Sequence, residues 1–289
     1  MTGHPAAGIG FADRSRQTAD VATPLHNLAV RRTSRSSWRE YPPSDEAGHA
    51  QDCTWTGIGG FRHSIMLVPD GCLDIVWNGA RLSASLPAAY GVRRRVEATS
   101  VNVGIRVRCG WAGAFLGSAL VDFRGAETDL GIAWGAFGEH AMARLCAAEE
   151  PAAIRAVLEA LLAERLADAA APSAVALESI WHLRAEPNLS VQALRRRLGG
   201  SERTVRRQIA AATGLSTKGL QRVFRFQAMR RRLESAAPSD SAAVIAAELG
   251  FADQPHMTRE CRAMTGRTPA ELRRRTSGGR NLQDRPRSR

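Results

Sequence analysis

Residues 240–269 read DSAAVIAAELGFADQPHMTRECRAMTGRTP, and this stretch determines the fold expected for the C-terminal part of the chain. Its first half repeats apolar residues at three- and four-residue steps from Ala242 to Leu249, which is the spacing of one apolar helix face. Gly250 then offers a turn, and Asp253 stands where a second helix would be capped. The pattern is typical of a helix-turn-helix whose second helix keeps a polar outer face.

The same pattern occurs once more upstream, in residues 190–214. The two stretches match at a shift of 51 residues before the turn and of 52 residues after it, so one inserted residue in the turn accounts for the change. Such a repeat is hard to obtain by chance, because apolar, glycine and polar classes all coincide. The matched pairs include Ser190 and Ser241, Leu194 and Ile245, Val205 and Met257, and Gly214 and Gly266.

Residues 217–234, between the two stretches, predict one continuous amphipathic helix. At a rise of about 1.5 Å per residue this helix would span about 27 Å. Successive major grooves on one side of a DNA duplex lie about 34 Å apart. One long helix would therefore carry two recognition helices to neighbouring grooves.

These motifs resemble the AraC/XylS transcriptional regulators. The resemblance covers residues 190–275 and departs from the family at Cys261, where a large aromatic is more common. It implies a DNA-binding domain over residues 172–275, RNA polymerase as a protein partner, and activation of transcription. The segments that carry it are LGGSERTVRRQIAAATGLS from Leu198, RFQAMRRRL from Arg225, and AAELGFADQPHMTRECRAMTGRTPAEL from Ala246.

The resemblance also implies which side chains contact DNA. Readout in the major groove needs an exposed face of donors and acceptors, held by a buried opposite face. For each arginine, a solvated or phosphate-contacting role is the open alternative. The predicted DNA-binding residues are Arg203, Arg206 and Arg207 in the first unit, and Gln254, His256, Arg259 and, nearer a phosphate, Thr258 in the second.

The charge of the chain is unevenly distributed. The net charge is +12, yet residues 1–171 hold 17 Lys and Arg against 18 Asp and Glu, whereas residues 172–289 hold 23 against 10. The whole excess thus lies on the half that carries the repeat. This asymmetry favours double-stranded DNA as the partner of that half.

Residues 58–137 predict a mixed, strand-rich regulatory domain, so the fold class expected for the whole chain is α+β, with an all-α domain of two helix-turn-helix units at the C-terminus. The Asn78-Gly79 pair indicates a two-residue hairpin turn. PDGCLDIVW, from Pro69, looks like the N-terminal domain of a subset of AraC-type regulators, for which no ligand is implied. Strands are predicted at 61–68, 72–77, 81–86 and 101–107.

The flanking segments complete the expected domain plan. Residues 1–57 are interpreted as a mostly disordered tail, and residues 276–289 as a basic disordered tail. Residues 138–171 predict a helical coupling or linker segment, for which packing within the N-terminal domain and formation of a dimer both stay open.

Asp70, Cys72 and Asp74 invite a site hypothesis, since two carboxylates bracket a thiol. The simpler interpretation is a turn capped by Asp70 and a strand on which Cys72 and Asp74 share one face. A part in an effector pocket is the second interpretation, and catalysis is the third. The five cysteines are dispersed without a C-x-x-C pair, which argues against a metal site and against a disulfide framework.

We therefore expect a sequence-specific DNA-binding transcription regulator and no enzymatic activity or cofactor. A small-molecule effector and a homodimer stay open. The alternatives are a non-specific architectural DNA binder, a thiol redox sensor acting through Cys72 or Cys109, and a repair alkyltransferase. No apolar run approaches the roughly 18 residues of a membrane span, and residues 1–30 lack a signal-peptide core, so a cytoplasmic location without a membrane partner is expected.

Overall fold

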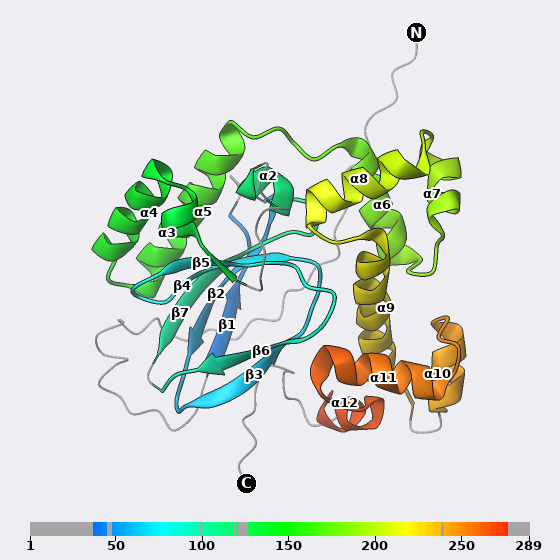
Figure 1. Cartoon of the computed structure of the whole chain (residues 1–289). Coiled ribbons are helices and arrows are strands. Elements are labelled where there is room, and N and C mark those ends of the chain that lie inside the picture. Colours follow the sequence, from blue (N-terminus) through cyan, green and yellow to red (C-terminus); the bar gives the residue numbers. More distant parts are fainter. Residues whose placement is uncertain are drawn as a thin grey trace.

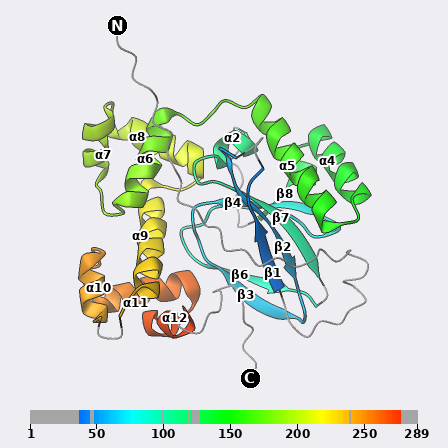
Figure 2. The ribbon, with the colours of Figure 1, turned by 180° about the vertical axis from the view of Figure 1, so that it is seen from behind.

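The structure is a computed structural model that describes residues 37–276, apart from 45–47, 99, 118–119, 121–126 and 238–239. Of the tails expected at 1–57 and 276–289, residues 1–36 and 277–289 lie outside the described residues. The described chain forms a strand-rich N-terminal part, the sheet domain, and a helical C-terminal part, the helical domain, which confirms the α+β prediction (Figure 1). The helical domain lies beside the sheet domain and not over its face (Figures 1 and 2).

A six-stranded antiparallel sheet, in the order β1-β2-β7-β4-β5-β8, forms the centre of the sheet domain. A separate antiparallel ribbon pairs β3 with β6. The strands are β1 (Ser37–Tyr41), β2 (Gln51–Ile58), β3 (His63–Leu67), β4 (Leu73–Trp77), β5 (Leu82–Ser85), β6 (Val92–Val96), β7 (Val101–Val107) and β8 (Glu127–Asp129).

Four of these strands were predicted, namely β3, β4, β5 and β7. The hairpin between β4 and β5 is also present, but Trp77 pairs with Leu82, so its loop is residues 78–81 and not two residues. The Asn78 side chain closes this loop, because its Oδ1 accepts the N–H groups of Ala80 at 3.0 Å and Arg81 at 2.8 Å. Asn78 therefore marks the turn through its side chain.

The expectation of a tail as far as residue 57 is wrong for the described part of that segment. β1 is an edge strand, and β2 lies inside the sheet between β1 and β7. On β2, Thr54 and Trp55 point to opposite faces, yet both are at most 5% exposed. A strand buried on both faces shows no alternation of polar and apolar residues, so periodicity did not reveal it.

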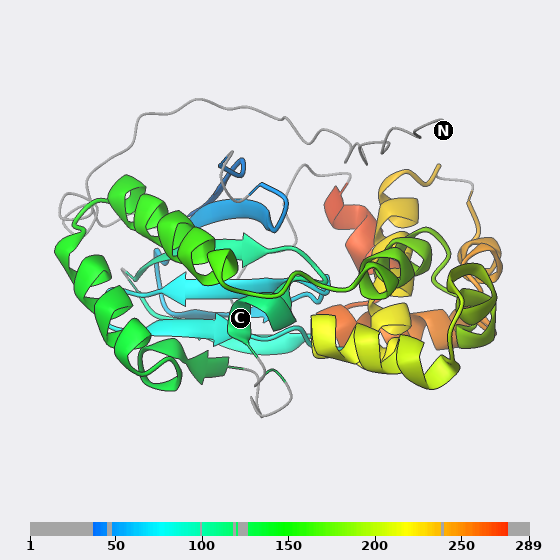
Figure 3. The ribbon, with the colours of Figure 1, turned by 90° about the horizontal axis from the view of Figure 1, so that it is seen from above.

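Helices cover one face of the sheet (Figure 3). α4 (Ala136–Ala147) and α5 (Pro151–Ala167) are preceded by the short helices α2 (Ala112–Leu116) and α3 (Leu130–Ala133). Leu158 and Leu162 of α5 pack in one buried cluster with Ile75 and Ile105 of the sheet. α4 and α5 are thus packed on the sheet-domain core, which favours packing within the N-terminal domain over dimer formation, the two interpretations left open for residues 138–171. The non-helical connection to the helical domain is 168–173.

The helical domain contains α6 (Ala174–Ala185), α7 (Val191–Leu198), α8 (Glu202–Thr213), α9 (Thr217–Glu234), α10 (Ala242–Glu248), α11 (Gln254–Thr265) and α12 (Pro269–Thr276). The predicted long helix is α9, with α8 near one end and α11 near the other, on the same side of it (Figures 1 and 3). Two buried clusters divide the domain, one around Val205 and Ile209 and the other around Met257 and Cys261. None of the helices described is both long and apolar enough to cross a membrane.

Candidate nucleic-acid interface

The two helix-turn-helix units, α7–α8 and α10–α11, begin their second helices with the same kind of cap. The Ser201 hydroxyl accepts the backbone N–H of Thr204 at 3.1 Å, and a carboxylate oxygen of Asp253 accepts that of His256 at 2.6 Å. Each cap satisfies an N–H that the helix itself leaves without a partner. The cap predicted at Asp253 is confirmed.

The second helices also end alike, at a threonine followed by a left-handed glycine. Gly214 and Gly266 have φ angles of 71° and 70°, which an L side chain rarely adopts. The Thr213 hydroxyl donates to the carbonyl four residues earlier at 2.7 Å and accepts the N–H two residues later at 3.1 Å; Thr265 repeats both distances. Sequence reasoning missed this pair, although the threonines stand at the 52-residue shift of the repeat.

On α8 the three predicted readers are exposed. Arg206 makes an ion pair of 3.4 Å with Glu202 one turn earlier. Within the described residues, no salt bridge joins Arg203 or Arg207 to a carboxylate. The opposite face of α8 is anchored by Val205 and Ile209, both 0% exposed, so the helix presents its arginines from a rigid support.

On α11 the predicted DNA-binding residues differ in solvent exposure. Gln254 and Arg259 are exposed, whereas His256 and Thr258 are half-buried. Nδ1 of His256 accepts the backbone N–H of Ala252 at 3.3 Å, which leaves Nε2–H as the ring donor of the neutral side chain. The structure thus places all seven predicted residues on the two helices expected to read DNA.

An open hollow of about 460 Å³ lies on α11, lined by Gln254, Pro255, Thr258, Arg259 and Arg262. Glu260, on the same helix, makes a 2.6 Å ion pair with Arg222 of α9. The charged residues that line the hollow are Arg259 and Arg262, both cations.

The chemistry of the two helices suits different base edges. Guanidinium groups pair with the O6 and N7 acceptors of guanine, whereas a glutamine amide pairs with N6 and N7 of adenine. A threonine methyl group makes apolar contact with the thymine methyl. The helices therefore offer three cations on α8 and a mixed set of donors, acceptors and cations on α11.

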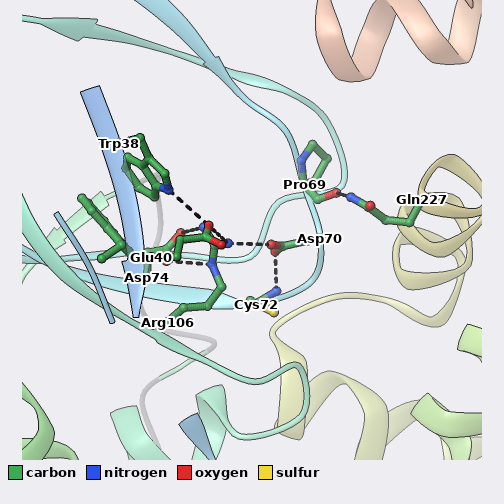
Figure 4. A network of polar contacts seen from close by, with 9 residues as sticks. Trp38, Glu40, Pro69, Asp70, Cys72, Asp74, Arg106 and Gln227 are labelled. Carbon is green, nitrogen blue, oxygen red and sulfur yellow. Dashed lines mark hydrogen bonds and ion pairs between the residues drawn. The ribbon is translucent and has the colours of Figure 1, made fainter. Parts of the chain in front are cut away.

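A second polar cluster lies in the sheet domain around Arg106, whose side chain is 13% exposed (Figure 4). Its Nε and one terminal nitrogen donate to the two carboxylate oxygens of Asp74 at 3.0 and 3.1 Å. Asp70 lies 3.6 Å and Glu40 3.8 Å from the guanidinium. Burial lowers the pKa of Arg106, but Asp74 and Asp70 outweigh burial and raise it well above its ordinary value, so the group stays charged.

This cluster supports the simpler interpretation of Asp70, Cys72 and Asp74. Asp70 caps the turn by accepting the N–H of Cys72 at 2.9 Å, and Asp74 holds Arg106. Trp55 donates its Nε1–H to Asp74 at 3.2 Å and stacks on Trp38 with ring centroids 4.1 Å apart. The hollow beside the turn measures about 40 Å³, far below the several hundred Å³ of ordinary ligand pockets.

The cysteines named in the redox alternative are poorly suited to it. Burial raises the pKa of the Cys72 thiol well above its ordinary value, and the nearby Asp70 raises it further. Burial likewise raises the pKa of Cys109 to about 12. Because the thiolate is the reactive form, these environments argue against redox sensing and against alkyl transfer.

Comparison with known proteins bears on the helical domain. Residues 194–275 match the family described as a helix-turn-helix domain. No curated protein sequence matches the chain. The family match confirms the helix-turn-helix prediction for this C-terminal part of the chain.

Three solved structures are similar to parts of the chain. An AraC-type transcriptional regulator from Chromobacterium violaceum is 23% identical over 36% of this chain and 92% of its own, with a TM-score of 0.33. The DNA-binding domain of AdpA, in complex with a target DNA, is 24% identical over 37% of this chain and 92% of its own, with a TM-score of 0.31. ToxT from Vibrio cholerae O395 is 10% identical over 85% of this chain and 100% of its own, with a TM-score of 0.37.

Proposed function

We propose that this protein is a sequence-specific transcription regulator whose two recognition helices, α8 and α11, enter successive major grooves from one subunit. The observation that carries the proposal is the exposure of five of the seven predicted readers on two capped helices at opposite ends of α9. These five are Arg203, Arg206, Arg207, Gln254 and Arg259. The span of about 27 Å expected for α9 is of the order of the groove repeat of about 34 Å.

The proposal assigns unequal roles to the two helices. Arg203 and Arg207 contact guanine or phosphate in one half-site, whereas Gln254 and His256 supply hydrogen bonds to bases in the other. Arg259 faces the bases together with Gln254 and His256, and Thr258 lies nearer a phosphate. Family resemblance extends the proposal to contact with RNA polymerase.

The test is selection of binding sites from random duplex DNA by the full chain, followed by affinity measurement at several salt concentrations. We expect an enriched bipartite sequence and a log–log salt slope of about −5 or steeper, because six or more phosphates would be neutralised. Arg203→Ala or Arg207→Ala should cost about 1–3 kcal/mol on the selected site and relax preference at one or two positions.

Arg62→Ala provides the matched control, since Arg62 is an exposed arginine of the sheet domain paired with Glu97 at 2.7 Å. It should leave both affinity and preference unchanged. Enrichment of no sequence would favour the architectural alternative. An equal loss on every sequence in the α8 variants would assign Arg203 and Arg207 to phosphate contacts and contradict the proposed readout.

A further inference from the structure

The sheet domain contacts α8 at its C-terminal end, through α2. Gly113 of α2 lies so close to the Ala211 carbonyl oxygen that a Cβ at this position would collide with it. Leu120 packs nearby, since a Cβ on Gly214 would lie 3.3 Å from its side chain. Gly113 is not among the glycines with a positive φ, so close approach and not backbone conformation requires the glycine.

A second contact joins the sheet domain to the middle of α9. Nε2 of Gln227 donates to the carbonyl oxygen of Pro69 at 2.6 Å, and Gln227 is only 8% exposed (Figure 4). The same turn carries Gly71, where a Cβ would lie 3.6 Å from Leu220 of α9. The Asp70 carboxylate in this turn also faces Arg106, so the docked turn is tied to the interior of the sheet.

A third contact holds the C-terminal end of α11. The backbone N–H of Gly91, in the loop between β5 and β6, donates to the Ala263 carbonyl at 3.1 Å. A Cβ on Gly91 would collide with the Met264 carbonyl oxygen, and this φ too is not positive. Both recognition helices are therefore held by backbone-to-backbone approach to one and the same domain.

The contacts leave the candidate DNA-reading surface free. Arg203 and Gln254 stand in the first turns of α8 and α11, whereas Ala211 and Ala263 stand in their last turns. Both reading residues remain exposed while the domains are docked. Docking thus uses the last turn of each helix, and the predicted reading residues all precede that turn.

The two units are also linked without the sheet domain. Nδ2 of Asn188, in the loop before α7, donates to the Leu249 carbonyl in the turn after α10 at 2.9 Å, and this hydrogen bond is exposed. Apart from packing along α9, α11 is joined to that helix by the Arg222–Glu260 ion pair, whose side chains are 36% and 22% exposed. Partly exposed pairs hold two elements together only weakly. One inserted base pair moves a half-site by about 3.4 Å and rotates it by about 34°, a displacement that a rigid pair of helices cannot follow.

We propose that the sheet domain sets the separation and rotation of the two recognition helices, and so selects operators by the spacing of their half-sites. Gly91, Gly113 and Gln227 act as positioning residues for this selection. The inference rests on the proposed function, since it concerns the same two half-sites.

The experiment measures binding of the full chain to the selected operator and to versions with one base pair inserted or deleted between the half-sites. The wild type should bind both altered spacings about tenfold or more weakly, a loss of the size that a mismatched base pair causes. Gly113→Ala and Gly91→Ala should bind the three spacings within about threefold of one another, because their Cβ atoms separate the domains at one end. Gln227→Ala should relax the spacing preference in the same direction by a smaller factor.

Matched controls keep the result interpretable. Gln221 lies on the same helix and donates to the Leu189 carbonyl at 2.7 Å inside the helical domain, so Gln221→Ala should keep the wild-type spacing preference. Circular dichroism verifies folding, and alanine is the better helix former at position 113. If the variants keep the wild-type spacing profile, or the wild type binds its selected sequence equally at all spacings, the inference is wrong. If the wild type selects no sequence at all, the proposed function itself fails.

Discussion

The two helix-turn-helix units share a backbone but differ in how they carry charge. Caps, terminal threonines and left-handed glycines repeat from one unit to the other with nearly the same geometry. The outer faces do not repeat: α8 bears Arg203, Arg206 and Arg207, whereas α11 bears Gln254, His256 and Arg259. The repeat therefore preserves the residues that cap and end each second helix, while the exposed face predicted to read DNA differs between the units.

Several equivalent interior positions differ between the two units, and the pair Ile209 and Cys261 should show the largest difference in stability. Ile209 and the equivalent Cys261 are both 0% exposed. Ile209→Ala should destabilise the protein by about 2–5 kcal/mol, because it leaves a cavity in the first cluster. Cys261→Ala removes a single sulfur and should cost about 1 kcal/mol. Urea denaturation of the full chain measures both, and equal losses would show that the second cluster is packed as tightly as the first.

Substitution of Thr213 or Thr265 should lower stability by the same amount, because the two residues make equivalent hydrogen bonds at equivalent helix ends. Thr213→Val and Thr265→Val each leave a backbone N–H near the helix end without its partner, at an expected cost of about 1–3 kcal/mol. The two costs should agree, because the bonds match at 2.7 and 3.1 Å in both units. Thr→Ser at either position keeps the hydroxyl and is the control. Thermal unfolding measures both costs. A large loss of stability for only one of the two Val variants would show that the threonines are not equivalent.

Removal of either N-cap should have a smaller effect on stability, and the two caps should differ in how that effect depends on salt. Ser201→Ala and Asp253→Ala should each cost about 1 kcal/mol, because each removes one accepted N–H. Of the two caps, only Asp253 carries a negative charge at the positive end of its helix. The stability cost of Asp253→Ala should therefore shrink at high salt, while that of Ser201→Ala stays constant. Chemical denaturation at low and high salt tests this; parallel salt responses would mean that the charge of Asp253 adds nothing to its cap.

Much of the helical domain follows from local rules. The limits of α9 and the cap at Asp253 agree with prediction because apolar spacing and capping act within a few residues. β2 was not predicted, because burial on both faces removes the alternation of polar and apolar residues on which strand prediction depends. The predicted readers are placed on exposed helices, whereas Thr213 and Thr265 were missed although the repeat contained them.

The contacts between the domains could not be predicted at all. Gly91 and Gly113 are ordinary glycines in the sequence, and only the approach of a distant carbonyl gives them a role. The same is true of Gln227, whose partner Pro69 lies 158 residues away in the chain. Long-range backbone approach leaves no periodic pattern, so it becomes visible only in three dimensions.

The stacked indoles of Trp38 and Trp55 give the sheet domain an optical signal of its own. Their ring centroids lie 4.1 Å apart with planes inclined by 24°, close enough for their electronic transitions to couple. Among the described residues, no other pair of tryptophans is stacked in this way. An exciton couplet in the far-ultraviolet circular dichroism would therefore come from this pair. Trp55 also donates a hydrogen bond to Asp74, which accepts one from Arg106. Any movement of this network would therefore change the spectrum, and no label on the protein would be needed to detect it.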